Sequence, residues 1–120
     1  MKREYPKHPI PAVGVVVFKG ENILLIQRNK PPKAAEWSIP GGAQELGETM
    51  IETAFREVKE ETGIEIDNVD LLKTVDFIDK DSNGNIQFHY SLIDFIADHK
   101  SGNLIAGDDA FNAKWVPLMN

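Results

Sequence analysis

Two short runs of branched apolar residues near the start of the chain predict a β-hairpin. The first run covers Val13 to Phe18 and the second covers Ile23 to Arg28, with a glycine-containing turn at Lys19 to Asn22 between them. Clusters of β-branched residues around a glycine turn are typical of paired strands. Three prolines precede the first run, and each removes a backbone donor, so we expect an extended arm there and not a helix.

The clearest predicted helix of the chain begins after Thr49. Thr49 and Glu52 have the spacing of a capping box, and apolar residues follow at helical intervals. These residues, which we expect to form the buried stripe of the helix, are Met50, Ile51, Ala54, Phe55 and Val58. Gly63 stands where a C-terminal cap is expected, so the helix should end there.

The second half of the chain predicts a longer hairpin and a final short strand. Val69 to Ile78 favours a strand, residues 79–85 favour a turn, and the residues after the turn alternate between apolar and polar. The alternation breaks at Ile93, where we expect a bulge or the end of the strand. We expect a long loop over Asp98 to Asp109 and a last strand over Lys114 to Leu118.

Composition and charge narrow the classes of function. The 120 residues are 42% hydrophobic, which suffices for one core, and the absence of cysteine excludes disulfides and thiolate metal sites. The net charge of −6 disfavours nucleic acid as a partner. The longest apolar stretch, Ala12 to Phe18, is too short to cross a membrane, and the N-terminus lacks the pattern of a secretory signal. We therefore expect a single cytoplasmic domain.

Acidic residues concentrate on the predicted helix and the loop before it. Seven glutamates and only two basic residues lie between Glu45 and Glu65. At about 100° per residue, Glu57, Glu60 and Glu61 fall within an arc of roughly 100° beside the apolar stripe. Carboxylates at these spacings repel one another, and Mg²⁺ or Mn²⁺ would offset the repulsion because both prefer carboxylate oxygens. A solvated acidic face is the alternative, and the spacing alone does not decide between the two.

The residues around the helix also match a fixed pattern. The pattern is a glycine, five residues, a glutamate, seven residues, Arg-Glu, an aliphatic residue, any residue, Glu-Glu, any residue, a glycine and an aliphatic residue. Its positions in this chain are Gly42, Glu48, Arg56, Glu57, Val58, Glu60, Glu61, Gly63 and Ile64. Residues 42–64 thus resemble the Nudix box of the Nudix hydrolase superfamily without departure. The flanking segments HPIPAVGVVVF, EWSIPGG and GDDAFNAKWVPL are similar to the ADP-ribose pyrophosphatase branch.

The resemblance implies a fold and a domain organisation. It implies an α/β protein, a Nudix-type three-layer α/β/α sandwich around a mixed β-sheet, formed by residues 1–120 as a single domain. Relatives usually carry another helix after the last strand, and this sequence ends at Asn120, so we expect either a truncated sequence or an unusually short domain that lacks a C-terminal helix. The apolar first hairpin and the proline-rich arm are consistent with a homodimer.

The resemblance also implies a divalent cation, Mg²⁺ or Mn²⁺, and the groups that bind it. Carried over to this chain, the metal ligands are the carboxylates of Glu57, Glu60 and Glu61 and the backbone carbonyl of Gly41. Glu48 supports the metal shell, directly or through water. Arg56 lies against the carboxylate cluster and orients Glu57, as residues around metal ligands commonly do.

The general base and the substrate contacts stay open at this stage. The base that deprotonates the attacking water is one of Glu60, Glu61, Asp108 and Asp109, and the sequence does not choose among them. Arg28, at the end of the second predicted strand, is a candidate phosphate clamp because guanidinium matches phosphate oxygens, although an ordinary strand-end arginine is equally consistent.

Further substrate contacts are predicted near the glycine pair and among the aromatic residues. We expect Gly41 and Gly42 to contact the substrate. Tyr5, Phe77 and Tyr90 are candidates to stack on a purine, although packing is the commoner role of such residues.

The predicted activity is hydrolysis of a nucleoside diphosphate linked to another moiety. ADP-ribose is the expected substrate, with AMP and ribose 5-phosphate as products. A nucleoside triphosphate pyrophosphatase that acts on substrates such as 8-oxo-dGTP is the alternative, and a non-catalytic domain that senses a nucleotide is a third hypothesis. We expect a small nucleotide as partner and neither nucleic acid nor membrane.

Overall fold

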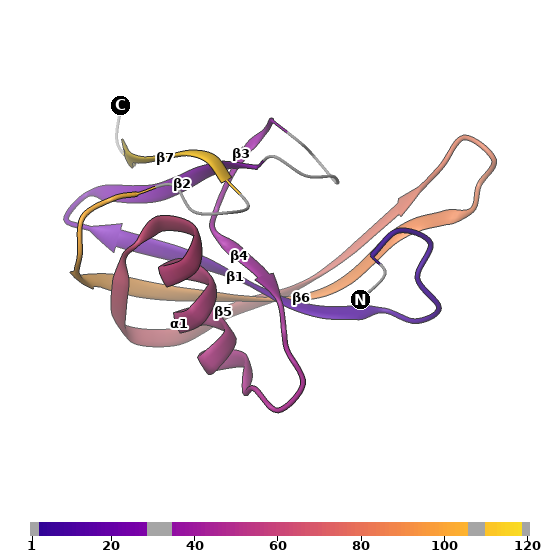
Figure 1. The fold of residues 1–120 in the computed structure, drawn as a ribbon, viewed down its shortest axis with the longest axis horizontal. Coiled ribbons are helices and arrows are strands. Elements are labelled where there is room, and N and C mark those ends of the chain that lie inside the picture. The colour runs from indigo at the N-terminus through magenta and orange to yellow at the C-terminus, as the bar shows by residue number, and fades with distance from the viewer. Residues whose placement is uncertain (1–2, 29–34, 106–109, 119–120) are drawn as a thin grey trace.

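The computed structural model describes residues 3–28, 35–105 and 110–118, and these form a mixed β-sheet with a helix packed against it (Figure 1). The elements are β1 (Ile10–Lys19), β2 (Asn22–Arg28), β3 (Trp37–Ser38), β4 (Gly41–Ala43), α1 (Met50–Thr62), β5 (Glu65–Lys80), β6 (Ile86–Ser101) and β7 (Ala110–Pro117). The predicted α/β class and mixed sheet are confirmed. The described residues contain one helix, so the second helical layer of the predicted sandwich is not among them.

β1 is the strand around which the sheet is organised. The strand order is β3-β2-β1-β6-β5, with β4 paired to β1 and β7 paired to β2. β1 runs parallel to β6 along almost its whole length. On its other side, residues 12–14 pair with β4 and residues 18–19 pair with β2, both antiparallel. β4 and β2 thus pair with different parts of the same edge of β1.

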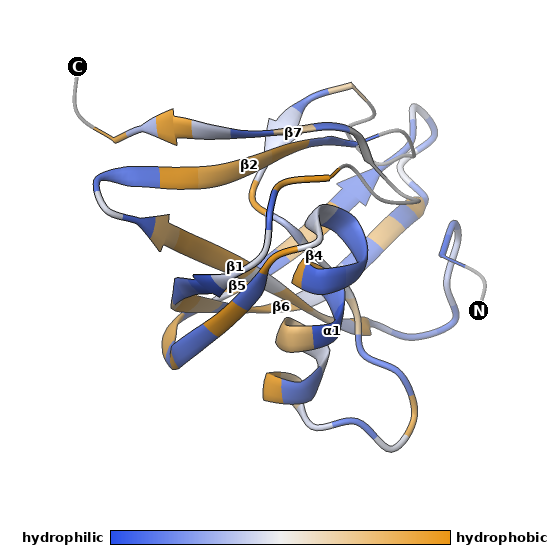
Figure 2. Ribbon diagram, turned by 60° about the vertical axis from the view of Figure 1, so that its left-hand side comes forward, coloured by the Kyte–Doolittle hydropathy of each residue, from blue (hydrophilic) through white to orange (hydrophobic). Residues whose placement is uncertain are grey.

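The two faces of β1 belong to two apolar clusters. Val13, Val15 and Val17 share one cluster with Ala54 and Val58 of α1, and Figure 2 shows hydrophobic residues along β1 and β2. The second cluster contains Ile10, Ala12, Ala43, Phe88 and Tyr90. α1 therefore covers one face of the sheet, and the second cluster lies beside the long hairpin formed by β5 and β6.

The helix has the predicted ends but a different buried face. Thr49 and Glu52 form the capping box, and Gly63 caps the helix with a left-handed φ of 76°. The predicted apolar stripe is wrong at Ile51 and Phe55, which are 46% and 43% exposed. Ala54 and Val58 are buried as predicted, and the further buried residues are Thr53, Glu57, Glu61 and Thr62. Glu57 and Glu61 face inward because Arg56 and the backbone N–H of Gly41 bind their carboxylates.

The hairpin of β5 and β6 is longer than the sequence predicts. β6 continues through Ile93 to Ser101, so the predicted strand end at Ile93 and the loop prediction for residues 98–101 are wrong. The register of β5 against β6 shifts at four places, and one of these, between Leu71 and Lys73, lies opposite Phe95 and Asp94, just after Ile93. The final strand, β7, also starts earlier than predicted. Long strands form here because β6 is paired on both of its edges, with β1 and with β5.

The N-terminal segment lies along the far end of this hairpin, as Figure 1 shows. The backbone N–H of Tyr5 donates to the carbonyl of Gln87 at 2.8 Å, and the Tyr5 hydroxyl donates to Asp81 Oδ2 at 2.8 Å. These bonds fix the arm before it enters β1. No helix among the described residues is long and apolar enough to cross a membrane.

Candidate functional site

Arg56 of α1 joins four carboxylates into one network, three by hydrogen bonds and that of Glu45 by an ion pair at 3.5 Å. Its Nε donates to Glu48 Oε2 at 2.6 Å and its Nη2 donates to Glu48 Oε1 at 2.9 Å. Its Nη1 donates to Glu57 Oε1 at 2.8 Å and to Glu60 Oε2 at 3.2 Å. Nη2 also donates to the Ala43 carbonyl of β4 at 3.0 Å. One guanidinium therefore fixes these carboxylates relative to one another and ties them to β4, because its planar group directs several donors at once.

Glu48 is bound from three sides in the loop before the helix. Besides Arg56, it accepts hydrogen bonds from the Thr53 hydroxyl and from the backbone N–H of Glu45, both at 2.9 Å. The hydrogen bond from Arg56, helped by the bond from Glu45, lowers the pKa of the Glu48 carboxyl to about 2. In turn, the hydrogen bond to Glu48, helped by the charges of Glu57, Glu48 and Glu45, raises the pKa of Arg56 above its usual value. Glu48 is thus ionised at neutral pH.

This lowered pKa predicts a pH dependence of stability. A carboxyl whose pKa is lower in the fold than in the unfolded chain stabilises the fold above its ordinary pKa. For Glu48 we expect this contribution to be complete above about pH 4.5 and to disappear as the pH falls toward 2. Thermal melts of the wild type and Glu48→Gln between pH 2 and 7 should therefore differ most above pH 4.5 and converge on acidification. A difference that does not vary with pH would contradict this expectation.

The two buried glutamates of the helix contact β4, the glycine strand that contains Gly41 and Gly42. Glu61 is 3% exposed, and its Oε1 accepts the backbone N–H of Gly41 at 2.8 Å. Glu57 is 9% exposed, and a Cβ at Gly42 would overlap its carboxylate. A Cβ at Gly41 would overlap the carbonyl oxygen of Val13 in the neighbouring strand. The two glycines are therefore required for the close approach of β4 to both the helix and β1.

The carboxylates fit a divalent cation in their chemistry. Glu57 and Glu61 point inward one turn apart, whereas the side chain of Glu60 is 57% exposed. Carboxylate and carbonyl oxygens are the ligands that Mg²⁺ and Mn²⁺ prefer. In the part of the chain that the structure describes, no three acidic or histidine side chains are grouped closely enough to hold a metal ion. The oxygen ligands that such an ion needs are present. Arg56 binds Glu57 and Glu60, and the backbone N–H of Gly41 binds Glu61.

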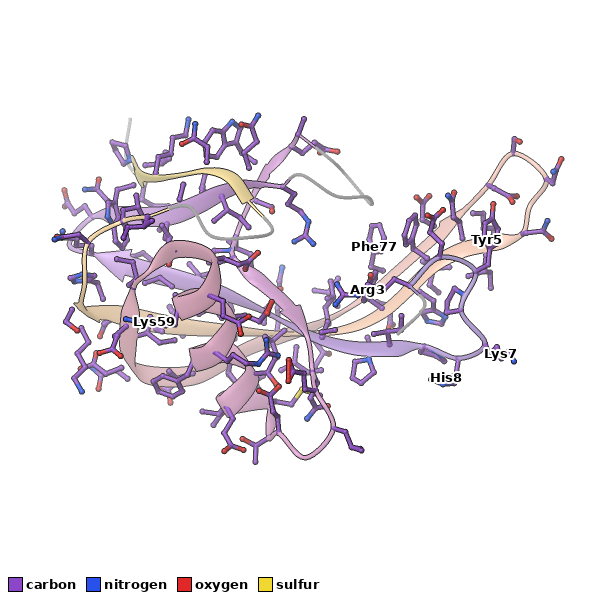
Figure 3. The ribbon with its side chains drawn as sticks, viewed as in Figure 1. Arg3, Tyr5, Lys7, His8, Lys59 and Phe77 are labelled. Atoms are coloured by element: carbon purple, nitrogen blue, oxygen red, sulfur yellow. The ribbon has the colours of Figure 1, made fainter. Side chains whose placement is uncertain are left out.

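A cavity of about 290 Å³ lies next to the glycine strand. Gly41, Gly42 and Arg28, the predicted substrate contacts, all line it. Phe77 and Tyr90 line it as well, whereas Tyr5 does not. Figure 3 shows Phe77 beside Arg3, another lining residue, where the long hairpin leaves the body of the sheet. Two of the three aromatic candidates thus face a space that borders the carboxylate network. The remaining predicted residues, Asp108 and Asp109, lie outside the described residues.

Asp94 of β6 is a cavity residue that was not predicted from the sequence. It is 9% exposed, and its burial raises the pKa of its carboxyl, with Lys73 acting in the opposite direction. Asp94 shares a face of β6 with Tyr90 and Leu92 because it lies four and two residues beyond them. A lone acid within an apolar stretch was the available signal. The break in alternation at Ile93 obscured it.

Comparisons with known proteins agree with this geometry. A family model described as NUDIX domain matches residues 8–120. The chain is 41% identical over 113 residues to an ADP-ribose pyrophosphatase of Methanocaldococcus jannaschii, covering 94% of this chain and 64% of that protein. The chain therefore spans less than two thirds of the length of this relative.

Solved structures show the same fold. A MutT NUDIX hydrolase of Burkholderia pseudomallei matches with a TM-score of 0.82 and 29% identity, covering 92% of this chain and 84% of that one. A bifunctional NMN adenylyltransferase/ADP ribose pyrophosphatase of Francisella tularensis, complexed with AMP and a manganese ion, matches with a TM-score of 0.69 and 26% identity. That match covers 94% of this chain and 35% of the other.

Proposed function

We propose, because the chain belongs to the Nudix hydrolase family, that it hydrolyses a nucleoside diphosphate linked to another moiety and that ADP-ribose is its substrate. The observation that carries the proposal is the carboxylate network of Arg56 beside the cavity at the glycine strand. The 41% identity to an ADP-ribose pyrophosphatase supports the choice of substrate.

The groups proposed to bind the cation are those brought to β4 by the helix and its preceding loop. Glu57, Glu60 and Glu61, with Glu48 and the Gly41 carbonyl, would hold Mg²⁺ or Mn²⁺. The cation supplies Lewis-acid stabilisation of the charge on the phosphate oxygens. The Francisella tularensis enzyme is complexed with both AMP and manganese, which supports this choice of ion and of product.

The proposed reaction is a substitution at phosphorus. The oxygen of water bonds to one phosphorus of the diphosphate while the bond from that phosphorus to the bridging oxygen breaks. From ADP-ribose the products are AMP and ribose 5-phosphate. Glu60, Glu61, Asp108 and Asp109 remain the candidates to accept the proton of the attacking water. Arg56 is a positioning residue because it holds Glu48, Glu57 and Glu60 and contacts no substrate atom in this proposal.

A product assay tests the proposal against its main alternative. We expect purified protein with Mg²⁺ or Mn²⁺ to convert ADP-ribose to AMP and ribose 5-phosphate, resolved by chromatography, and to lose this activity when EDTA removes the metal. Release of inorganic pyrophosphate from 8-oxo-dGTP, with ADP-ribose untouched, would assign the nucleoside triphosphate pyrophosphatase instead. Absence of turnover on both and on a dinucleoside polyphosphate, with nucleotide still bound, would indicate a sensing domain.

A cytoplasmic homodimer remains part of the proposal. Among the described strands, β5 lies at an edge of the sheet and carries apolar side chains in solvent, which supports a surface for self-association. Leu71, Leu72 and Ile78 are 64%, 48% and 51% exposed. Apolar side chains grouped on an edge strand favour pairing with another chain.

A further inference from the structure

One hydroxyl without a partner and one buried acidic residue border the same cavity. Asp94 is 9% exposed, Lys73 acts on it through its charge, and within the described residues no hydrogen bond ends on its carboxylate. The hydroxyl of Ser38 on β3 is buried, and among those residues it too has no hydrogen-bond partner. Buried hydroxyl groups in native proteins nearly always have partners, so the Ser38 hydroxyl, together with an acidic side chain in the same cavity, points to a ligand.

The backbone around Asp94 leaves room for its carboxylate. Asp94 lies beside Gly14 in the parallel pairing of β6 with β1. A Cβ at Gly14 would lie 2.6 Å from Asp94 Oδ1 and 2.9 Å from Ile39 Cδ1. A side chain at position 14 would therefore displace the carboxylate from its place. The carboxylate occupies the space that the glycine leaves free on the cavity side of the sheet.

The other residues that line the cavity indicate which chemical groups its ligand carries. Trp37, Phe77 and Tyr90 provide aromatic surface, and the rings of Phe77 and Tyr90 lie 6.3 Å apart at 45°. Arg3 and Arg28 provide cations of the kind that bind phosphate. A carboxylate repels phosphate and accepts hydrogen bonds from neutral O–H and N–H groups. The cavity thus combines surfaces suited to a base, to phosphate and to hydrogen-bond donors.

We propose that Asp94, together with Ser38, determines specificity by binding the O–H or N–H donors of the nucleoside or sugar part of the substrate. This proposal rests on the proposed function, because it assigns a part of the same substrate to this cavity. Asp94 holds the donor-bearing part of the substrate, and phosphate groups are directed away from it toward the arginines and the glycine strand.

The stability of an Asp94 variant distinguishes a role in binding from a purely structural role. Burial disfavours its ionised form more than Lys73 favours that form, which is why the pKa of its carboxyl is raised. We therefore expect Asp94→Asn to melt at the same or a higher temperature than the wild type while it binds substrate more weakly. A residue that held the fold together would lose stability on the same substitution.

The decisive experiment compares Asp94→Asn with Asp98→Asn, a matched change four residues along the same strand and outside the cavity. We expect Asp94→Asn to raise KM for ADP-ribose about tenfold or more, the loss typical of a hydrogen bond to a charged group, with kcat little changed. Asp98→Asn should match the wild type. A KM for Asp94→Asn within twofold of the Asp98→Asn value would overturn the proposal if binding of the two products is also unchanged.

Titration calorimetry with AMP and with ribose 5-phosphate tests the same residue without turnover. Weaker binding of one product by Asp94→Asn identifies the half of the substrate that carries the donors. If it is AMP, 2′-deoxy-AMP and inosine monophosphate separate a ribose hydroxyl from the amine of the base. The analogue that lacks the relevant donor should bind wild type and variant equally. If the wild type does not hydrolyse ADP-ribose, the proposed substrate is wrong, and unchanged binding of both products would then overturn the role of Asp94 separately.

Discussion

Glu60→Gln is expected to lower kcat about a thousandfold or more while the melting temperature stays within a few degrees of the wild type. Stabilisation of transition-state charge by a metal ion amounts to several kcal/mol, and each 1.36 kcal/mol corresponds to a tenfold change in rate. The side chain of Glu60 is 57% exposed, and its ion pair with Arg56 at 3.2 Å is of a kind that contributes at most about 1 kcal/mol. Its loss should therefore affect activity and not folding.

The chain offers a matched control for this variant. Glu65 is also an exposed carboxylate, 3.9 Å from Lys59, and it lies just after the helix. Glu65→Gln makes the same chemical change and should keep wild-type kcat. A manganese titration of Glu60→Gln followed by electron paramagnetic resonance should show weaker binding than the wild type. A kcat for Glu60→Gln within tenfold of the control would remove Glu60 from the proposed metal ligands.

Gly41→Ala is expected to cause the largest loss of stability, about 3 kcal/mol, or roughly 10–20 °C in melting temperature. The added Cβ would overlap the backbone carbonyl of Val13, which cannot rotate away as a side chain can. The pairing of Gly41 with Gly14 and the bond from the Val15 N–H to the Pro40 carbonyl at 2.9 Å would both be strained. Urea denaturation of both proteins measures the difference in free energy of unfolding.

Gly42→Ala is the informative comparison for that variant. Its added Cβ would overlap the carboxylate of Glu57, which is the end of a rotatable side chain. We expect a smaller loss of stability than for Gly41→Ala and a large loss of kcat, because Glu57 must leave its place. Equal destabilisation by the two substitutions would show that the backbone contact of Gly41 is not the stricter constraint.

Features that depend on neighbouring residues were predictable from the sequence. The capping box of Thr49 and Glu52 and the cap at Gly63 were predicted because their hydrogen bonds form within a few residues. Helix spacing placed Glu57, Glu60 and Glu61 near one another, whereas the contact of Arg56 with Glu57 was implied only by the resemblance of residues 42–64 to the Nudix box. The inward direction of Glu57 and Glu61 was not predictable, since it depends on β4 and on the hydrogen bond donated by Gly41.

Features that depend on distant strand pairing were not predictable. The run of β6 through Ile93 depends on pairing with both β1 and β5, which a local alternation pattern cannot show. For the same reason Asp94 was missed, because its burial depends on its position beside Gly14. Arg28 was predicted to lie near the substrate because of its chemistry alone. Its place in the cavity depends on strands from both halves of the chain.

The parallel pairing of β1 with β6 also bears on how the chain folds as it is synthesised. Ile10 lies beside Tyr90, and Phe18 lies beside Asp98, so most of the chain must leave the ribosome before β1 gains its parallel partner β6. The β5–β6 hairpin joins neighbours in sequence and can form earlier, because local contacts close faster than distant ones. The order of synthesis and the order of pairing therefore differ, and β1, which precedes the other strands in the sequence, gains β6 only after most of them have been made.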